Sequence, residues 1–391
     1  MALRFTMLVL AFAIISCNKK ETKENVAGSI KITFNTANLL YEDVFKKTLI
    51  IPLETNSNCL ISKISQMKIY KNKIFILDIN LNALLVFNME GRFLNRIGSV
   101  GKGPGEYIRP RYFFISEKDG LVKVFDAPMK KLICFDIEGK YNKDITVDKY
   151  LSNVGETNSG YWGYCADRIN DGINSKQQRT LKFFIFDSEG QLKGHISGRE
   201  NIDNINLSNA YILNDMGESV SFVEPFSPDI YYLKNGEISV KYKIDYSGFS
   251  PPQSVLSKVG NMKAPISKMG MEFLNTITYE YASFFINFLE NENWILLSTP
   301  FKTRTIIYNK IEKKSTEFSN IFWSNKERKP YFYPCCIEDD NLICYAGYDD
   351  IKRELSINNQ ISIGRKKKLE SLVAEMKNND NPVVLICTMN D

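Results

Sequence analysis

One repeated unit constrains the fold of this chain of 391 residues more than any other feature. The unit is an apolar run, a short polar break, a second run that ends in Asp or Asn, a Glu-Gly or Asn-Gly step and a third run. Four copies share a turn glycine at steps of 48, 51 and 46 residues: Gly91, Gly139, Gly190 and Gly236. Two further copies begin at Trp294 and Asn341. The chain therefore contains six related units.

Each unit alternates apolar and polar residues with a period of two, which is typical of β-strands. A glycine after Glu or Asn supplies the positive φ that a tight hairpin needs. Units of about 45–50 residues have the spacing of propeller blades, and blades close into a ring because one blade cannot bury both of its faces alone. The sequence predicts an all-β, six-bladed β-propeller with short helical insertions.

Two segments interrupt the repeat and predict those insertions. Residues 251–290 have mixed, partly helical apolar spacing, and residues 359–380 have the spacing of an amphipathic helix. Upstream, residues 47–56 form a strand-like run that belongs to no unit. We expect this run to complete the last blade, so that the propeller covers residues 30–391.

The N-terminus carries a short apolar run, Leu8–Ile15, between Arg4 and a charged stretch. The run is too short to span a bilayer of about 30 Å, so it predicts a signal peptide over residues 1–16. The sequence IISC at its end resembles the lipobox of bacterial lipoproteins, in which the cysteine is acylated. The resemblance implies a lipid on Cys17, a flexible tether over residues 17–29, and a place in the cell envelope at the outer membrane, with the periplasmic or surface side left open.

The glycine-rich segment IGSVGKGPGEYIRP, Ile97–Pro110, raises the question of phosphate binding. A P-loop needs a hydroxyl residue after its lysine, but Gly103 follows Lys102. A dinucleotide-binding fingerprint needs a glycine where Glu106 stands, followed by a helix. A strand-like run follows instead, so the segment is interpreted as a linker between blades.

Together with the strand–turn–strand unit after it, this linker resembles an NHL repeat. The whole chain resembles the six-bladed β-propeller lipoproteins of Bacteroidetes. The likeness rests on the lipobox, on IPLETNSNCLISKISQMKIYKNKIFILD near the start, on EPFSPDIYYL in the middle and on NPVVLIC at the end. It implies a fold and a location, and it implies no particular activity. The glycine-rich linker is missing from the later units.

Two groups of residues are candidate ligand contacts on an end face of the ring. The first group comes from the linker: Glu106, Tyr107, Arg109 and Arg111. The second is an aromatic cluster: Tyr161, Trp162 and Tyr164. Exposed rings would stack on a glycan, and Trp323, Tyr331 and Tyr333 form a similar cluster. The alternatives are that the linker residues only brace a turn and that the rings pack between blades.

The chemistry of the remaining residues is sparse. His195 is the single histidine, which excludes a zinc or iron site built from several histidines of one chain. We predict no cofactor; a calcium ion is left open at the acid pairs 339–340 and 349–350, although solvated turns explain both. A strained disulfide between the neighbours Cys335 and Cys336 is also left open.

The net charge of +5 is spread along the chain, so we predict no nucleic-acid partner. The preferred interpretation is a lipid-anchored, non-catalytic binding or scaffold protein for a glycan, peptide or protein. The alternative is a carbohydrate-active lyase or hydrolase with carboxylates at the central channel. If the protein is an enzyme, we expect acids or tyrosines to converge in a deep central pocket. If it is a binding protein, we expect a shallow aromatic face or a plugged channel. If it is a structural subunit, we expect a broad apolar patch.

Overall fold

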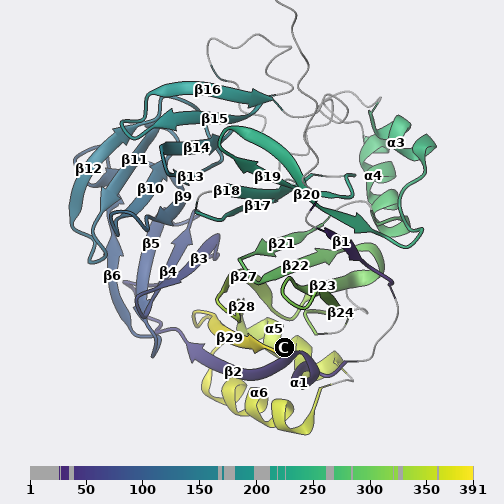
Figure 1. Ribbon diagram of the computed structural model, residues 1–391. Helices are drawn as coiled ribbons and strands as arrows, with labels where there is room; N and C mark the ends of the chain where they lie inside the picture. The colour runs from purple at the N-terminus through teal and green to yellow at the C-terminus, as the bar shows by residue number, and fades with distance from the viewer. Residues whose placement is uncertain are drawn as a thin grey trace, which may run out of the picture.

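The protein is a six-bladed β-propeller (Figure 1). Six antiparallel sheets surround one axis, and each sheet contributes its first strand to the wall of the central channel. The computed structural model describes residues 26, 28–34, 39–165, 170, 181–197, 212–217, 219–224, 226–260, 268–282, 285–319, 321–324, 329–358 and 361–390.

The first three blades follow one another along the chain. The first blade consists of β3 (Gln66–Tyr70), β4 (Lys73–Asp78), β5 (Ala83–Asn88) and β6 (Phe93–Ile97). The second consists of β9 (Pro110–Ile115), β10 (Val122–Asp126), β11 (Lys131–Phe135) and β12 (Tyr141–Thr146). The third consists of β13 (Asn153–Thr157), β14 (Gly160–Tyr164), β15 (Leu181–Asp187) and β16 (Leu192–Ser197). Their second strands are buried along most of their length, because they have a strand on each side and a blade on each face.

The last three blades complete the ring. The fourth consists of β17 (Ile212–Asp215), β18 (Ser219–Val223), β19 (Asp229–Lys234) and β20 (Glu237–Asp245). The fifth consists of β21 (Asn287–Glu290), β22 (Trp294–Thr299), β23 (Arg304–Asn309) and β24 (Lys314–Phe318). The sixth consists of β27 (Tyr333–Glu338), β28 (Asn341–Ala346), β29 (Val383–Met389) and β2 (Phe45–Pro52). The N-terminal strand β2 pairs with β29, so both ends of the chain share this blade.

The repeated turns between third and fourth strands are built alike. In the first blade, the side-chain oxygen of Asn88 accepts hydrogen bonds from two backbone amides of its own turn, at 3.1 and 2.8 Å. Asp136 and Asp187 do the same in the next two blades. The glycine of the first turn, Gly91, has φ of +79°, which a residue with a side chain rarely adopts. The repeated unit has Asp or Asn because the turn amides need an acceptor, and it has Gly because the turn needs a positive φ.

The N-terminal segment crosses the outer edges of three blades. Strand β1 (Gly28–Lys31) pairs in parallel with β20 of the fourth blade. The amides of Thr33 and Phe34 then donate to the carboxylate of Glu317 in the fifth blade, at 2.7 and 2.9 Å. We call β1, Ile32, Thr33, Phe34 and β2 together the strap. It begins at Gly28, inside the stretch that we expected to be tether.

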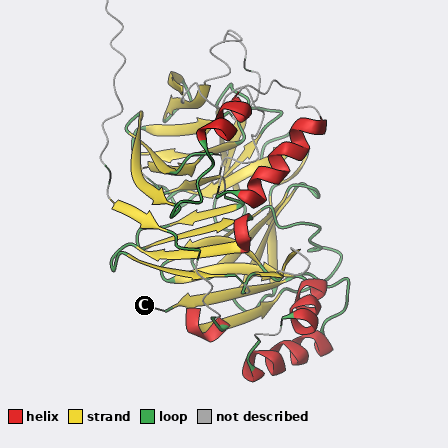
Figure 2. Cartoon of the chain, turned by 90° about the vertical axis from the view of Figure 1, so that its right-hand side faces the viewer, coloured by secondary structure: helices red, strands yellow, loops and turns green. Residues whose placement is uncertain are grey.

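Helices lie between strands rather than in a separate domain. Helices α3 (Gln253–Gly260) and α4 (Lys268–Glu280) connect the fourth and fifth blades, where an insertion was expected. Helices α5 (Tyr348–Ile357) and α6 (Ile363–Glu375) connect β28 to β29. Figure 2 shows one pair of helices at the upper sheets and the other pair beside the lowest sheet. Within the described residues, no helix is long and apolar enough to cross a membrane.

Shorter elements fill the connections. These are α1 (Tyr41–Val44), the 3-10 turn η2 (Phe301–Thr303), and the two-residue strands β7 (Ser99–Val100), β8 (Glu106–Tyr107), β25 (Trp323–Ser324) and β26 (Lys329–Pro330). The hydrophobic core is divided among the interfaces between neighbouring blades. Phe75 of the first blade and Phe113 of the second, for example, lie 6.5 Å apart between ring centroids. This packing leaves the polar faces of the first strands around the axis.

Candidate functional site

Two cavities lie between the first strands of the blades and share four lining residues, and we call the two together the channel. The larger, of about 440 Å³, is lined mainly by β3, β17, β21 and β27, and we call it the chamber. The smaller, of about 270 Å³, is lined by the ends of the first strands and the turns after them, and we call it the mouth. The residues that line both cavities form the waist of the channel: Gln66, Lys68, Tyr112 and Asp215.

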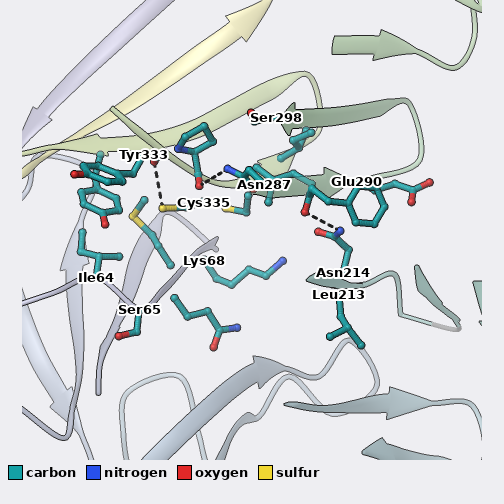
Figure 3. A pocket seen from close by; sticks show the side chains of 18 of the residues that line it. Ile64, Ser65, Lys68, Leu213, Asn214, Asn287, Glu290, Ser298, Tyr333 and Cys335 are labelled. Atoms are coloured by element: carbon teal, nitrogen blue, oxygen red, sulfur yellow. Dashed lines mark hydrogen bonds between the residues drawn. The ribbon is translucent and has the colours of Figure 1, made fainter. Parts of the chain in front are cut away.

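Amide side chains connect neighbouring first strands around the chamber. Gln66 of β3 donates to the carbonyl of Phe113 in β9 at 2.7 Å and accepts from its amide at 3.0 Å. Asn214 donates to a carbonyl of β21 at 3.0 Å, and Asn287 donates to a carbonyl of β27 at 3.2 Å (Figure 3). Backbone groups at the edges of the sheets thereby find partners, and the wall of the chamber is held in place.

Lys68 extends from β3 into the chamber (Figure 3). Its ammonium nitrogen lies 3.6 Å from a carboxylate oxygen of Glu338 in the sixth blade. Burial favours the neutral amine, but the Glu338 carboxylate outweighs it, so the pKa of Lys68 lies above its usual value. The waist therefore carries a permanent positive charge near neutral pH.

Asp215 ends β17 and is the acid of the waist. One of its oxygens accepts a hydrogen bond from the amide of Gly217 at 3.1 Å. Burial raises the pKa of Asp215 to about 7, although the charge of Lys68 acts in the opposite direction and that of Glu156 adds to the increase. A carboxyl group that changes charge near neutral pH is a mark of functional sites.

Gly155 of β13 makes room for this acid. A Cβ atom at Gly155 would lie 2.4 Å from an oxygen of Asp215 and 2.6 Å from the Trp162 ring. Only a glycine lets the Asp215 carboxyl group approach the third blade so closely. The buried Trp162 ring thus supports the channel wall from behind.

Tyrosines contribute the aromatic part of the site. Burial raises the pKa of Tyr112 at the waist above its usual value, so its phenol stays neutral. Tyr333 and Tyr345 line the chamber as a stacked pair, with ring centroids 4.8 Å apart and ring planes 13° apart. Of the sequence candidates, Tyr333 is thus in the channel.

The other buried acids near the channel are bound to lysines. Glu156 lies 2.7 Å from Lys123 and accepts a hydrogen bond from Ser116 at 2.6 Å. Glu290 forms an ion pair with Lys310 and accepts a hydrogen bond from Tyr232. Asp215 is different, since in the described part of the chain no lysine or arginine forms an ion pair with it.

The linker residues predicted as ligand contacts do not line either cavity. Tyr107 is fully buried, and its hydroxyl donates to the carbonyl of Ile97 at 2.9 Å. The carboxylate of Glu106 accepts a hydrogen bond from the amide of Gly103 at 2.8 Å. Both side chains thus close the linker on itself, which is the bracing alternative.

The two linker arginines lie outside the channel as well. The side chain of Arg109 is exposed, and that of Arg111 is half-buried. The backbone amide of Arg109 donates to the carboxylate of Asp126 at 2.9 Å. Their part in binding a ligand stays a prediction.

The aromatic cluster is covered by neighbouring blades. Its rings lie on β14, with 4%, 0% and 3% of the residue exposed for Tyr161, Trp162 and Tyr164. These rings therefore pack between blades, which is the second alternative left open by the sequence, because the second strand of a blade has neighbours on both faces. Tyr331 is buried too.

The remaining candidates from the sequence are three cysteines and two pairs of acids. Cys17 lies outside the described residues, and Cys335 and Cys336 are free thiols that line the chamber. Asp340 accepts a hydrogen bond from the Trp294 indole at 2.8 Å, while the acid pair 349–350 lies in the first turn of α5 rather than in a loop. Among the described residues, no group of three or more His, Cys, Asp or Glu is arranged to hold a metal ion.

Sequence reasoning missed Lys68, Tyr112 and Asp215. The fourth unit was recognised from Ser221 onward, so β17 lay outside it. The first strands carry no shared motif, because each contributes a different polar side chain to the channel. One feature of the sequence could have located such channel residues. It is a polar residue inside an apolar run just before each unit, such as Asn214 in the run ILND.

Comparison with known proteins places the chain in a family. A family model described as a domain of unknown function, DUF4934, matches residues 28–388. The chain belongs to the DUF4934 family. The match begins at the first residue of β1, so the strap is part of the DUF4934 domain. No curated protein matches the sequence.

Two solved structures share the fold of this DUF4934 protein. One is described as a "putative exported protein" of Bacteroides fragilis, with 18% identity and a TM-score of 0.70 over 94% of this chain and 100% of the other. The second is a DUF4221 family member of Bacteroides vulgatus, with 13% identity and a TM-score of 0.51 over 88% of this chain and 96% of the other. At such identities the likeness shows the fold.

Proposed function

We propose that this protein is a lipid-anchored binding protein of the cell envelope that holds a small polar ligand in its central channel. The observation that carries the proposal is the waist, where Lys68, Tyr112 and Asp215 come together from three different blades. Ligand sites are concave and have a few convergent polar groups on a preformed wall. The channel has these properties, so we place the site there rather than on the end face expected from the sequence.

The proposed location rests on the N-terminus and on the exported description of a protein with the same fold. A short apolar run followed by IISC is the pattern of a signal peptide and a lipidation site. Labelling of cells with a palmitate analogue tests the anchor. We expect the label on the wild-type protein and none on Cys17→Ala; continued labelling of that variant would refute the anchor.

Binding is preferred to catalysis because Glu156 and Glu290 are held in ion pairs. A hydrolase that acts with two carboxyl groups needs both of them free at the substrate. One observation favours the second candidate, a carbohydrate-active lyase or hydrolase. Asp215 and the neutral Tyr112 share the waist, and an acid with a pKa of about 7 is suited to proton transfer.

A glycan and peptide binding screen tests the proposed function, with protein that begins after Cys17. Ser65 is exposed in the chamber wall, so Ser65→Trp fills the chamber without disturbing the core. Ser356→Trp, on the exposed face of α5, is the matched control. We expect the first variant to lose ligand binding at an unchanged melting temperature and the control to keep it.

Undiminished binding by Ser65→Trp would remove the channel from the proposal. The same ligands, incubated with the wild type and analysed for cleavage products, test the second candidate. Turnover that disappears in Asp215→Asn would establish an enzyme, and intact ligands would exclude catalysis on them.

A further inference from the structure

The charges that line the mouth, taken together, favour a positively charged ligand. Four acids and two lysines line the mouth: Glu117, Glu156, Asp215, Glu338, Lys68 and Lys118. With Lys123, which is bound to Glu156, the acids exceed the lysines by one when Asp215 is ionised. A narrow cavity with low-dielectric walls concentrates the field of such a charge. We propose that the waist binds the primary ammonium group of a small organic amine, with Asp215 as counter-ion. This inference rests on the proposed function of the channel.

The lysines of the mouth leave Asp215 available for this role. Lys118 donates a hydrogen bond to the carbonyl of Thr157, and Lys68 lies beside Glu338. Glu156 already has Lys123 and Ser116 as partners. Among the described residues, the Asp215 carboxyl group accepts one hydrogen bond, from the amide of Gly217. A carboxyl group accepts up to four, so this one has room for a donor from the ligand.

The chamber above the waist suits the organic part of such an amine. The stacked rings of Tyr333 and Tyr345 supply an aromatic wall, and Leu213 supplies an apolar contact. Aromatic faces attract organic cations as well as apolar groups. The amide links at Asn214 and Asn287 keep this wall fixed, which reduces the entropy lost on binding.

The site also predicts how binding depends on pH. The charged and titratable groups that face Asp215 are Lys68, Tyr112, Glu117 and Glu156, with Glu338 beyond Lys68. Lys68 and Tyr112 keep their charge states near neutral pH, because both pKa values lie above their usual range. Asp215 loses its proton near pH 7, and an ammonium ion prefers the carboxylate. Affinity therefore rises with pH, about tenfold from pH 6 to pH 8, as the ionised fraction does.

The test uses probes whose charge is constant in this range. Nα-acetyl-lysine amide carries a primary ammonium, its Nε-acetylated form is the neutral match, and Nα-acetyl-glutamate amide is the anionic match. A second pair, 6-amino-6-deoxyglucose and glucose, distinguishes an amino sugar from a lysine-like amine. Calorimetric titrations at about pH 6 and pH 8 compare the wild type with Asp215→Asn. Asp148→Asn, at an exposed aspartate outside the channel, is the control.

We expect the ammonium probes to bind at least tenfold more tightly than their neutral matches at pH 8. Asp215→Asn should lose this preference and the pH dependence while its melting curve shows a folded protein, and the control should behave as the wild type. Equal binding of charged and neutral probes, or preference for the glutamate probe, would overturn the inference. The proposed function, ligand binding in the channel, would still stand. If these probes and every ligand of the screen fail to bind, both the inference and the proposed function fail.

Discussion

Single carboxylates fasten the linkers between blades. Asp126 is fully buried at the end of β10 and accepts hydrogen bonds from the amides of Arg109, at 2.9 Å, and Met129, at 3.0 Å. Asp78 has the same position in the first blade and accepts from four backbone amides at 2.6 to 3.0 Å. Buried amides without a partner are costly, so these acids determine how one blade is attached to the next.

We expect Asp126→Asn to lower the free energy of unfolding by about 2–3 kcal/mol, because at least one buried amide loses its charged acceptor. Urea denaturation measures the change. Asp148→Asn is the control, since Asp148 is exposed and pairs with Lys130 at 3.3 Å on the surface. Surface pairs contribute little to stability. Equal effects of the two variants would contradict the role assigned to Asp126.

At the scale of elements, one buried ion pair holds the helical insertion together. Arg365 of α6 donates two hydrogen bonds to the Glu354 carboxylate of α5, at 2.7 and 3.0 Å. Its guanidinium also lies over the ring of Tyr41, 3.7 Å from the ring centroid. Arginine is suited to this place because its planar group makes paired hydrogen bonds and stacks on rings. The insertion is thereby attached to the chain beside the strap.

We expect Arg365→Lys to destabilise the protein by about 2 kcal/mol, since lysine keeps the charge but loses one hydrogen bond and the stacking. Hydrogen exchange should locate the change in α5 and α6. Arg92→Lys, on an exposed turn, serves as the comparison and should leave exchange unaltered. Faster exchange spread evenly over all blades would show that the pair acts on global stability instead.

Elements were predictable from the sequence where the backbone itself demands a residue type. The hairpin turns could be read because a positive φ requires glycine and the turn amides require Asp or Asn, as at Asn88 and Gly91. Helix α6 could be read from its apolar spacing. Helix α5 could not, because Gly347 and the acids after it also fit a loop. Asp215 could not either, since its environment is made by residues of other blades.

On the scale of the whole molecule, the strap joins the ends of the ring. β2 is the outer strand of a blade whose other strands lie at the opposite end of the chain. The strap also buries Ile30, Ile32 and Phe34 against the fourth and fifth blades. A propeller closed in this way resists opening, because separating β2 from the rest of the sixth blade would break the hydrogen bonds between β2 and β29.

A variant that begins at residue 39 keeps α1 and β2 but loses the rest of the strap. We expect it to be less stable than a variant beginning at residue 26 by about 5 kcal/mol, because three buried apolar side chains and the Glu317 hydrogen bonds are lost. Thermal unfolding of both proteins measures the difference. Identical melting temperatures would show that β1 and the residues after it cover the blades without stabilising the fold.

The strap also determines where a membrane anchor at the N-terminus would be attached to the ring. β1 begins on the outermost edge of the fourth blade, away from the axis. The chain between a lipid on Cys17 and Gly28 reaches about 40 Å at full extension. The tether would therefore join the ring at its outer rim, at the fourth blade. With the lipid that we propose on Cys17, the attachment point would lie at the rim, away from the residues that line the mouth, so the anchor itself would not cover the mouth.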